Sequence, residues 1–452
     1  MLITLAGHYT YRRIVRSVLP SIGMVLVTSI YSIVDGFFVA NFAGKSGFAA
    51  INLMYPPMMI LAALGLMVGS GGAALVAKVK GEGYPEKANR IFTVLIHFCA
   101  QLGIVMGLLF AIFCPTITHW LGADASMTHE CIVYGRLSMI GMPAFVLQMA
   151  FQSFYMAAER PQLGTLMAII SGVINIVFDA LFVWGLRMGV IGAALATVIA
   201  QIVGGFYPMV YFSSRRLNRG TLAFRHRTRV LWHYVGKACS NGLSEYVGNI
   251  TLSIVSICYN LQLMRLMGQD GVAAFGVVMY LAFVYAALFI GYNIAITPII
   301  GYHYGAQDVG EQRSLLHKSV MIIGVVGLVL TLLAEVLSAP LARLFVGYDA
   351  ALTALTTKAI RIYMLSFLIC GWNMFVSALF TALQNGIVSA GAALARSLVF
   401  ELSCVWLLPA LLGPDGIWLA VNVAELLTLG LCIVLVCRYA PQLVTHPLRR
   451  NR

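Results

Sequence analysis

Residues 47–64 read GFAAINLMYPPMMILAAL and residues 271–288 read GVAAFGVVMYLAFVYAAL, so one pattern of small and apolar residues occurs twice, 224 positions apart. A fixed offset that is kept along most of the chain indicates an internal duplication rather than chance similarity. The same offset relates five further pairs: Ser29 with Ser253, Gly44 with Gly268, Gly81 with Gly305, Gly192 with Gly416, and Gln201 with Glu425.

The repeated stretches belong to a series of long apolar runs. The chain has 452 residues, of which 60% are hydrophobic and 10% are charged, whereas a soluble domain carries about 25% charged residues. A helix needs about 20 apolar residues to cross a bilayer core about 30 Å thick. The runs therefore predict twelve membrane-spanning helices, near residues 14–40, 47–77, 90–120, 131–157, 162–185, 189–213, 231–264, 271–301, 314–345, 356–384, 387–412 and 416–438.

Duplication and span number together predict the architecture. Six spans per half is an even number, so both halves enter the membrane in the same orientation and are related by an axis along the membrane normal, as in some secondary transporters. We expect an all-α integral membrane protein with two six-helix bundles. The N-terminal lobe would comprise residues 1–212, a basic cytoplasmic linker residues 213–230, and the C-terminal lobe residues 231–452.

The net charge of +13 is explained by topology rather than by nucleic acid. If both termini are cytoplasmic, 22 of the 29 Lys and Arg residues fall on the cytoplasmic side, as the positive-inside rule requires. The first apolar run follows Arg12, Arg13 and Arg16, but it is too long for a cleavable signal peptide and contains Asp35. We therefore expect a multi-pass protein of the bacterial cytoplasmic membrane that contacts anionic lipid on its inner face.

Enzyme and cofactor motifs are missing from the sequence. The nine Cys are scattered without a Cys-x-x-Cys pair, the nine His form no H-E-x-x-H motif, and no G-x-x-x-x-G-K-[ST] loop is present. No disulfide framework, resident metal site, built-in ATPase or enzymatic centre is therefore expected, and no cofactor.

Acidic residues inside the predicted spans are the first candidates for function, because each costs about 2.5–3.5 kcal/mol in the bilayer centre even on lenient scales. Asp35 shares a helix face with Thr28 and Ser32, while Ser171, Asn175 and Asp179 recur every four residues on the fifth span. Thr197 and Gln201 form a third polar stripe, on the sixth span.

These three stripes could converge on an oxygen-rich pocket formed by Asp35, Asn175, Asp179 and Thr197. Such a pocket suits Na⁺, through hard oxygen ligands, or a proton shared between two acids. The alternative is that each acid is neutral or hydrogen-bonded to backbone and serves packing alone.

The second half also carries polar stripes that we expect to face a wet central cavity. On the seventh span Asn241, Glu245, Asn249 and Ser253 follow four-residue steps, and the tenth span carries Asn373, Ser377, Thr381 and Gln384. Glu401 has Arg396 as a nearby partner in sequence. Flexible Met and flat aromatic side chains suit promiscuous binding of planar cations. The candidate cavity residues are Tyr31, Ser32, Met139, Gln201, Glu245, Asn249, Tyr280, Tyr292, Asn373 and Met374.

Pro20 is a candidate hinge. It removes a backbone hydrogen bond from the first span and lies fifteen residues before Asp35. Protonation of Asp35 could therefore change the bend of this helix.

Five segments carry a family resemblance: VDGFFVANFAGKSGFAAINL, VAKVKGEGYPEKANR, NIVFDALFVWGLRMGVIGAALATVIAQ, GLSEYVGNI and GPDGIWLAVNVAELL. Together they resemble the multidrug and toxic compound extrusion (MATE) family, in particular its MepA-like branch, and the similarity extends over essentially the whole chain. The resemblance implies two six-helix bundles enclosing a cleft, with drug expelled in exchange for H⁺ or Na⁺. It places the coupling cation on Asp35, Asn175, Asp179 and Thr197. Other branches use acids in the C-terminal lobe, where this chain offers Glu245 but has Asn373 and no acid on the tenth span.

The sequence thus favours a monomeric, ion-coupled antiporter that exports small organic cations such as drugs and dyes. A flippase for lipid-linked oligosaccharides, from the same superfamily, is the alternative. Such a flippase would need several basic residues within its cavity, whereas the charges inside the predicted spans are mostly acidic.

Overall fold

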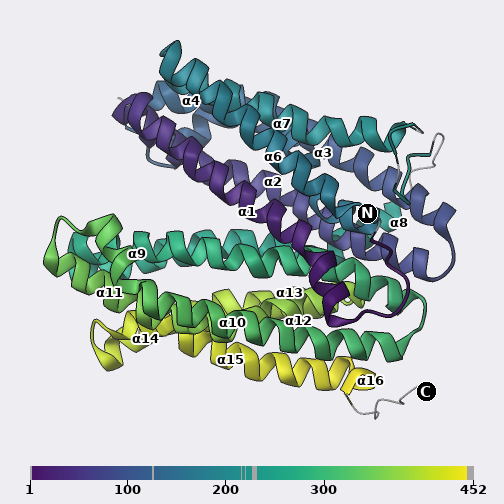
Figure 1. Ribbon diagram of the computed structural model, residues 1–452. Helices are drawn as coiled ribbons and strands as arrows, with labels where there is room; N and C mark the ends of the chain where they lie inside the picture. Colours follow the sequence, from purple (N-terminus) through teal and green to yellow (C-terminus); the bar gives the residue numbers. More distant parts are fainter. Residues whose placement is uncertain (1–2, 125–126, 215, 219, 226–231, 445–452) are drawn as a thin grey trace.

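The computed structural model describes residues 3–124, 127–214, 216–218, 220–225 and 232–444. Long helices, nearly parallel to one another, form almost all of it, and the first and last described residues lie at the same end (Figure 1). The elements are α1 (Tyr11–Phe42), α2 (Gly44–Gly81), α3 (Pro85–Trp120), α4 (Thr128–Ile140), α5 (Met142–Ala157), α6 (Pro161–Asp179), η1 (Ala180–Gly185), α7 (Gly189–Ser213), α8 (Trp232–Asn241), α9 (Leu243–Gly305), α10 (Val309–Val346), α11 (Ala350–Met364), η2 (Leu365–Leu368), α12 (Cys370–Ala382), α13 (Gly386–Leu394), η3 (Ala395–Glu401), α14 (Leu402–Leu412), α15 (Gly416–Tyr439) and α16 (Pro441–Val444).

The helices account for twelve membrane crossings. In the described part of the chain, ten helical spans are long and apolar enough to cross a bilayer, and α4 with α5, bent by 59°, forms an eleventh. One of the ten, α9, has 63 residues, which in one straight helix would extend about 95 Å at 1.5 Å per residue, far more than a single bilayer crossing needs. It is broken at Gly268 (φ 65°, ψ −150°), so its two arms cross separately.

The seventh span begins later than the sequence indicates. We expected it from residue 231, which lies outside the described residues together with residues 226–230 of the linker. In the structure the short α8 ends at Asn241 and α9 begins at Leu243. Gly242 separates them and lies against α2, where a Cβ atom would come within 1.9 Å of the Met67 carbonyl oxygen.

The backbone repeats the duplication seen in the sequence. Gly44 and Gly268 have φ of 82° and 65°, and Gly189 and Gly413 have φ of 56° and 73°. Both pairs are 224 residues apart, and both lie in a region of φ that is costly for residues with a Cβ. The two halves therefore turn at equivalent places between successive helices.

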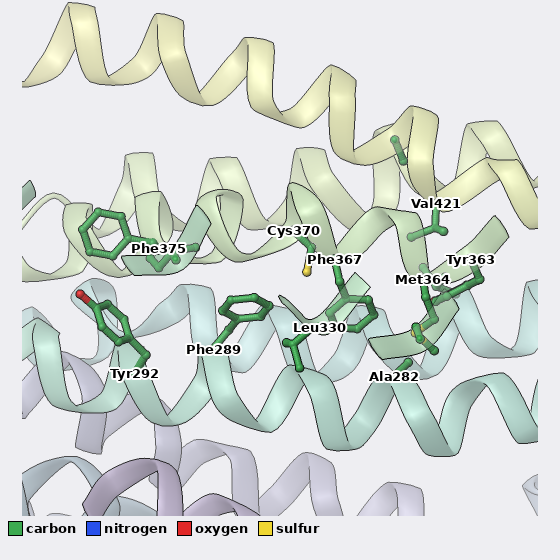
Figure 2. Close-up of a cluster of buried hydrophobic side chains, with 14 of the residues drawn as sticks. Ala282, Phe289, Tyr292, Leu330, Tyr363, Met364, Phe367, Cys370, Phe375 and Val421 are labelled. Carbon is green, nitrogen blue, oxygen red and sulfur yellow. The ribbon is translucent and has the colours of Figure 1, made fainter. Parts of the chain in front are cut away.

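Buried apolar side chains form two clusters in the described part of the chain. One draws nearly all its members from residues 24–238, including Phe92, Phe151 and Phe154. The other lies mainly in α9 to α15, where Phe289, Tyr292 and Phe375 lie between facing helices (Figure 2). Without a hydrophobic driving force inside lipid, such van der Waals contacts are a main source of helix association.

The first residues of the chain bind to both halves. Residues 3–10, here named the N-terminal strap, include Leu5 and Tyr9, which are fully buried. The Leu5 backbone N–H donates to Oε1 of Glu159 (3.4 Å), and the Tyr9 N–H donates to Oε1 of Glu311 (2.7 Å). Burial raises the pKa of the Tyr9 phenol. This phenol therefore stays protonated and donates to the Thr4 carbonyl oxygen (2.7 Å).

Candidate cation site in the N-terminal half

A buried polar stripe runs along α6. Ser171, Asn175 and Asp179 follow four-residue steps and are exposed by only 1%, 2% and 0%. Asp179 is the last residue of α6, and the π-helical segment η1 begins at Ala180. Short π segments inside helices are frequent at functional sites, because the extra residue per turn changes the direction in which side chains project.

Asp35 on α1 faces this stripe. The two helices lie close together, since a Cβ atom on Gly172 would come within 3.0 Å of the Tyr31 ring. The Asp35 carboxyl group lies within interaction range of Asn175 and Asp179. Thr28 and Ser32, its neighbours on α1, donate no hydrogen bond to Asp35. Their hydroxyls donate instead to carbonyl oxygens of their own helix (both 2.9 Å).

Several oxygen atoms of this site are buried and form no hydrogen bond of ordinary geometry among the described residues, although Asn175 and Asp179 approach the Asp35 carboxyl group. They are Oδ1 of Asp35, Oγ of Ser171, Oδ1 of Asn175 and both carboxyl oxygens of Asp179. A buried acceptor that stays unpaired costs about 1–3 kcal/mol, more if charged. A set of hard oxygen donors fits a cation such as Na⁺, and the two carboxyl groups could equally hold a proton. Among the described residues no group of three or more His, Cys, Asp or Glu side chains suits a transition metal.

Three tyrosines surround Asp35. Tyr31, Tyr55 and Tyr134 all lie within electrostatic range of its carboxyl group. Only Tyr31 was a sequence candidate. Tyr55 and Tyr134 come from α2 and α4, and no periodic pattern connects either residue to Asp35 in the sequence.

The two residues of the third stripe, on α7, differ in burial. Thr197 is half-buried on α7, and Gln201 is 8% exposed. The Gln201 side chain lies at the break between α4 and α5, where its Oε1 would be 2.5 Å from a Cβ atom on Gly141.

Pro20 lies where α6 of the first half and α9 of the second half both contact α1. The Thr165 hydroxyl of α6 donates to the Pro20 carbonyl oxygen (2.6 Å). Two residues further along α1, a Cβ atom on Gly291 of α9 would come within 2.5 Å of the Ile22 Cα. A change in the bend of α1 at this level would therefore alter its contacts with both halves.

The polar stripe of the tenth span does not face a wet cavity, and this expectation is corrected. Asn373 and Thr381 are 2% and 1% exposed. Asn373 Nδ2 donates to the Glu425 carboxylate (2.6 Å), and the hydroxyls of Ser377 and Thr381 share Ser389 (2.9 and 3.0 Å). The hydrogen bonds of this stripe therefore connect α12 to α13 and α15.

Arg396 has a different partner from the one expected. It lies ten residues into its span and binds Glu425, with Nε and Nη2 at 2.8 and 2.6 Å from Oε1. The sequence suggested Glu401, five residues away. Arg396 also lies inside a span and is half-buried, so it does not belong to the loop charges that set topology.

The remaining cavity candidates are spread over different environments. Glu245 and Asn249 are half-buried on α9, and the Asn249 amide donates to the Glu245 carbonyl oxygen (2.9 Å). Met374 is also half-buried, and Ser32 is exposed.

The last three candidates are two buried residues and one exposed residue. Met139 is 5% exposed in the N-terminal cluster, and Tyr292 is 4% exposed. The Tyr292 hydroxyl pairs with Ser319 (2.7 Å) within the core shown in Figure 2. Tyr280 is 57% exposed and stacks on Phe345.

The duplication is also found by comparison with known families. The family model MatE matches residues 20–181 and again residues 246–407. This chain belongs to the MatE family, the multidrug and toxic compound extrusion transporters. It is accordingly a multi-pass membrane transporter and not an enzyme.

Similar proteins cover almost the whole chain. Multidrug export protein MepA of Staphylococcus haemolyticus is 22% identical over 96% of this chain and 92% of its own length. The MepA protein of Staphylococcus aureus strain MRSA252 is 22% identical over 95% of this chain and 92% of its own length. The solved structure described as MATE in complex with MaL6 has a TM-score of 0.91 at 20% identity, covering 97% of this chain and 98% of that one. This MATE transporter therefore has the fold of two six-helix bundles expected from its sequence.

Proposed function

We propose that this MATE transporter exports small amphipathic organic cations in exchange for H⁺ or Na⁺. The observation that carries the proposal is the group of buried oxygen atoms without donors around Asp35 and Asp179. A cation or proton would pair with these oxygens, so the site has a strong reason to bind one. The names of the MepA relatives, multidrug export proteins, support the same direction of transport.

We further propose that the coupling ion binds among Asp35, Asn175, Asp179 and Thr197. A bound ion neutralises the carboxyl groups that would otherwise attract a cationic substrate. Ion and substrate therefore exclude each other, which is what an antiporter requires. The change in charge next to α1 would alter its bend at Pro20, and the two lobes, residues 1–212 and 231–452, would then alternate access to the two sides.

In this proposal the protein works as a monomer in the bacterial plasma membrane, with both termini in the cytoplasm. One charge moving through about 100 mV supplies roughly 2.3 kcal/mol. At 1.4 kcal/mol per tenfold ratio, this sustains an organic-cation gradient of about 50-fold. No nucleotide is needed for export of this size.

Ethidium efflux from proteoliposomes, driven by an imposed proton or sodium gradient, tests the proposal. Wild-type protein should move ethidium with one of the two gradients, and Asp35→Asn should lose at least about 90% of this flux because the ion no longer has its carboxylate. Asp270→Asn is the matched control, since Asp270 is an exposed acid on α9 and its loss should leave transport unchanged. Full coupling in Asp35→Asn would show that Asp35 is structural and would direct attention to Glu245.

If wild-type protein moves no organic cation under either gradient, the oligosaccharide flippase becomes the function to test. The structure gives that function little support, because Arg396, the basic residue deep in the eleventh span, is already bound by Glu425.

A further inference from the structure

The C-terminal half contains an ion pair between a buried carboxylate and a half-buried arginine that the proposed mechanism does not use. The Glu425 side chain is 3% exposed and Arg396 is 27% exposed. Both Nε and Nη2 of Arg396 donate to Oε1 of Glu425, while Asn373 donates to Oε2 at 2.6 Å. Each Glu425 oxygen therefore has a charged or amide donor, in contrast to the unpaired oxygens of the N-terminal half.

The internal repeat relates this ion pair to the candidate cation site. At the offset of 224, Glu425 occupies the position of Gln201, and Tyr259 occupies the position of Asp35. The helix that carries Asp179 and the helix that carries Arg396 each contain a π segment, η1 and η3. The helices of Asp35 and Asp179 thus correspond to those of Tyr259 and Arg396, whereas Glu425 corresponds to the neutral Gln201. Only the C-terminal group includes its own cation.

We propose that Arg396 is the tethered cation of a second, permanently occupied cation site in the C-terminal half. Its guanidinium group takes the place that a mobile Na⁺ or proton takes beside Asp35 and Asp179. The inference rests on the proposed function, and it explains why exchange of the coupling ion is confined to the N-terminal half. Arg396 is therefore a residue that determines which half exchanges the coupling ion.

Further ionisable and polar groups surround the Arg396–Glu425 pair, so the pair is part of a larger set of possible cation ligands. Glu401 lies within electrostatic range of both Arg396 and Glu425. The Tyr259 hydroxyl is buried without a partner among the described residues and lies within range of Glu401 and Glu425. Removal of the guanidinium would leave two carboxyl groups, the Asn373 amide and a tyrosine hydroxyl together in the protein interior. That set resembles the oxygen donors of the N-terminal site, and it should bind a free cation.

The test uses the purified full-length protein with the N-terminal site disabled by Asp35→Asn. The melting temperature is measured while Na⁺ rises from about 1 to about 200 mM at constant ionic strength, and separately while pH is varied. Asp35→Asn alone should show no response. Asp35→Asn with Arg396→Ala should gain a rise of at least about 3 °C with Na⁺, or a new pH dependence, because ligands that bind only the folded state stabilise it.

Two variants control for packing. Arg396→Lys in the Asp35→Asn protein keeps a tethered charge and should show no response to Na⁺ or pH. Adding Glu425→Gln to Arg396→Ala removes the acceptor and should abolish the gained response. The proposal is overturned if folded Asp35→Asn/Arg396→Ala protein responds to neither ion, or if Asp35→Asn protein with Arg396 intact already does.

Arg396→Ala could also prevent folding, since it leaves Glu425 without its counter-ion. In that case Glu425→Gln should restore folded protein, because the damage is electrostatic. Equal instability of the single and double variants would show that Arg396 acts by packing, and the proposal would fail. None of these results depends on ethidium transport, so failure here is distinct from failure of the proposed function.

Discussion

Gly81 and Gly305 are the residues at which the two halves approach each other most symmetrically. A Cβ atom on Gly81 would come within 2.0 Å of the Tyr302 carbonyl oxygen, and one on Gly305 would come within 1.9 Å of the Lys78 carbonyl oxygen. Lys78 and Tyr302 are themselves 224 residues apart. The contact is therefore self-complementary, as at a twofold interface between subunits.

Because these neighbours are backbone atoms, neither can move aside for a methyl group. We expect Gly81→Ala and Gly305→Ala each to destabilise this crossing by about 1–3 kcal/mol and to lower the melting temperature of the purified protein. Gly248→Ala is the matched control, because Gly248 is helical and a Cβ atom added there would have no neighbouring atom within 4 Å. It should be neutral or slightly stabilising. A melting temperature unchanged by Gly81→Ala would mean that α2 and α9 can separate without cost.

Single-residue placements can be inferred from the sequence where the determining contacts are local. The four-residue spacing of Ser171, Asn175 and Asp179 makes them share a helix face, and all three are buried. The partner of Arg396 could not be predicted in this way. Glu401 is near in sequence, but Glu425 is brought to Arg396 by the packing of α15 against η3, which no spacing rule contains.

At the scale of the element, proline and π segments interrupt the spans that carry the candidate site. Pro20 leaves the carbonyl group of Arg16 without its usual helical donor, because proline has no N–H. α1 nevertheless continues from Tyr11 to Phe42, and its Pro20 carbonyl group is held by Thr165. The helix is thus weakened at the level where α6 and α9 hold it.

Replacement of Pro20 by Ala would restore the missing hydrogen bond and stiffen α1. We expect Pro20→Ala to slow ion-coupled ethidium efflux several-fold, while the stabilisation of the protein by the coupling ion stays as in wild type. Pro340→Ala, inside α10, is the control for loss of a helix proline elsewhere and should leave efflux near the wild-type rate. Unchanged efflux in Pro20→Ala would rule out bending at this residue as a step in transport.

Element boundaries show why sequence prediction stops short of the full structure. The apolar runs placed the twelve spans because hydropathy depends on composition alone. The separation of α8 from α9 at Gly242 depends instead on the close approach of the Met67 carbonyl oxygen, a tertiary contact. The π segments after Asp179 and around Arg396 are equally invisible to a 3.6-residue period.

At the scale of the whole molecule, the two halves lie closer together at the end where α8 and α16 lie than at the opposite end (Figure 1). Gly81 meets Tyr302 there, and Gly71 lies against Ala238. The N-terminal strap adds to this closure by reaching Glu159 in the first half and Glu311 in the second. Duplication predicted two related bundles, but the strap precedes the residues that show the repeat, so the pattern could not reveal it.

Glu311 is the main anchor of the strap on the C-terminal half. It is 7% exposed, and its carboxylate accepts from the Tyr9 N–H and pairs with Nδ1 of His8, both at 2.7 Å. Glu311→Ala removes both contacts and leaves the Tyr9 N–H without an acceptor. Hydrogen bonds to charged groups are worth about 1.5–3 kcal/mol, so we expect local opening to become easier by about 2 kcal/mol. Amide hydrogen exchange of residues 3–10 should then be about 30-fold faster.

Glu86→Ala is the matched control for this experiment. Glu86 pairs with Arg225 at the same end of the molecule, but the two side chains are 65% and 42% exposed. Exposed pairs of this kind contribute little, so exchange of the strap should change less than about twofold. If Glu311→Ala also leaves exchange unchanged, burial of Leu5 and Tyr9 alone holds the strap. Faster exchange together with faster ethidium efflux would instead show that release of the strap limits how often this end of the transporter opens.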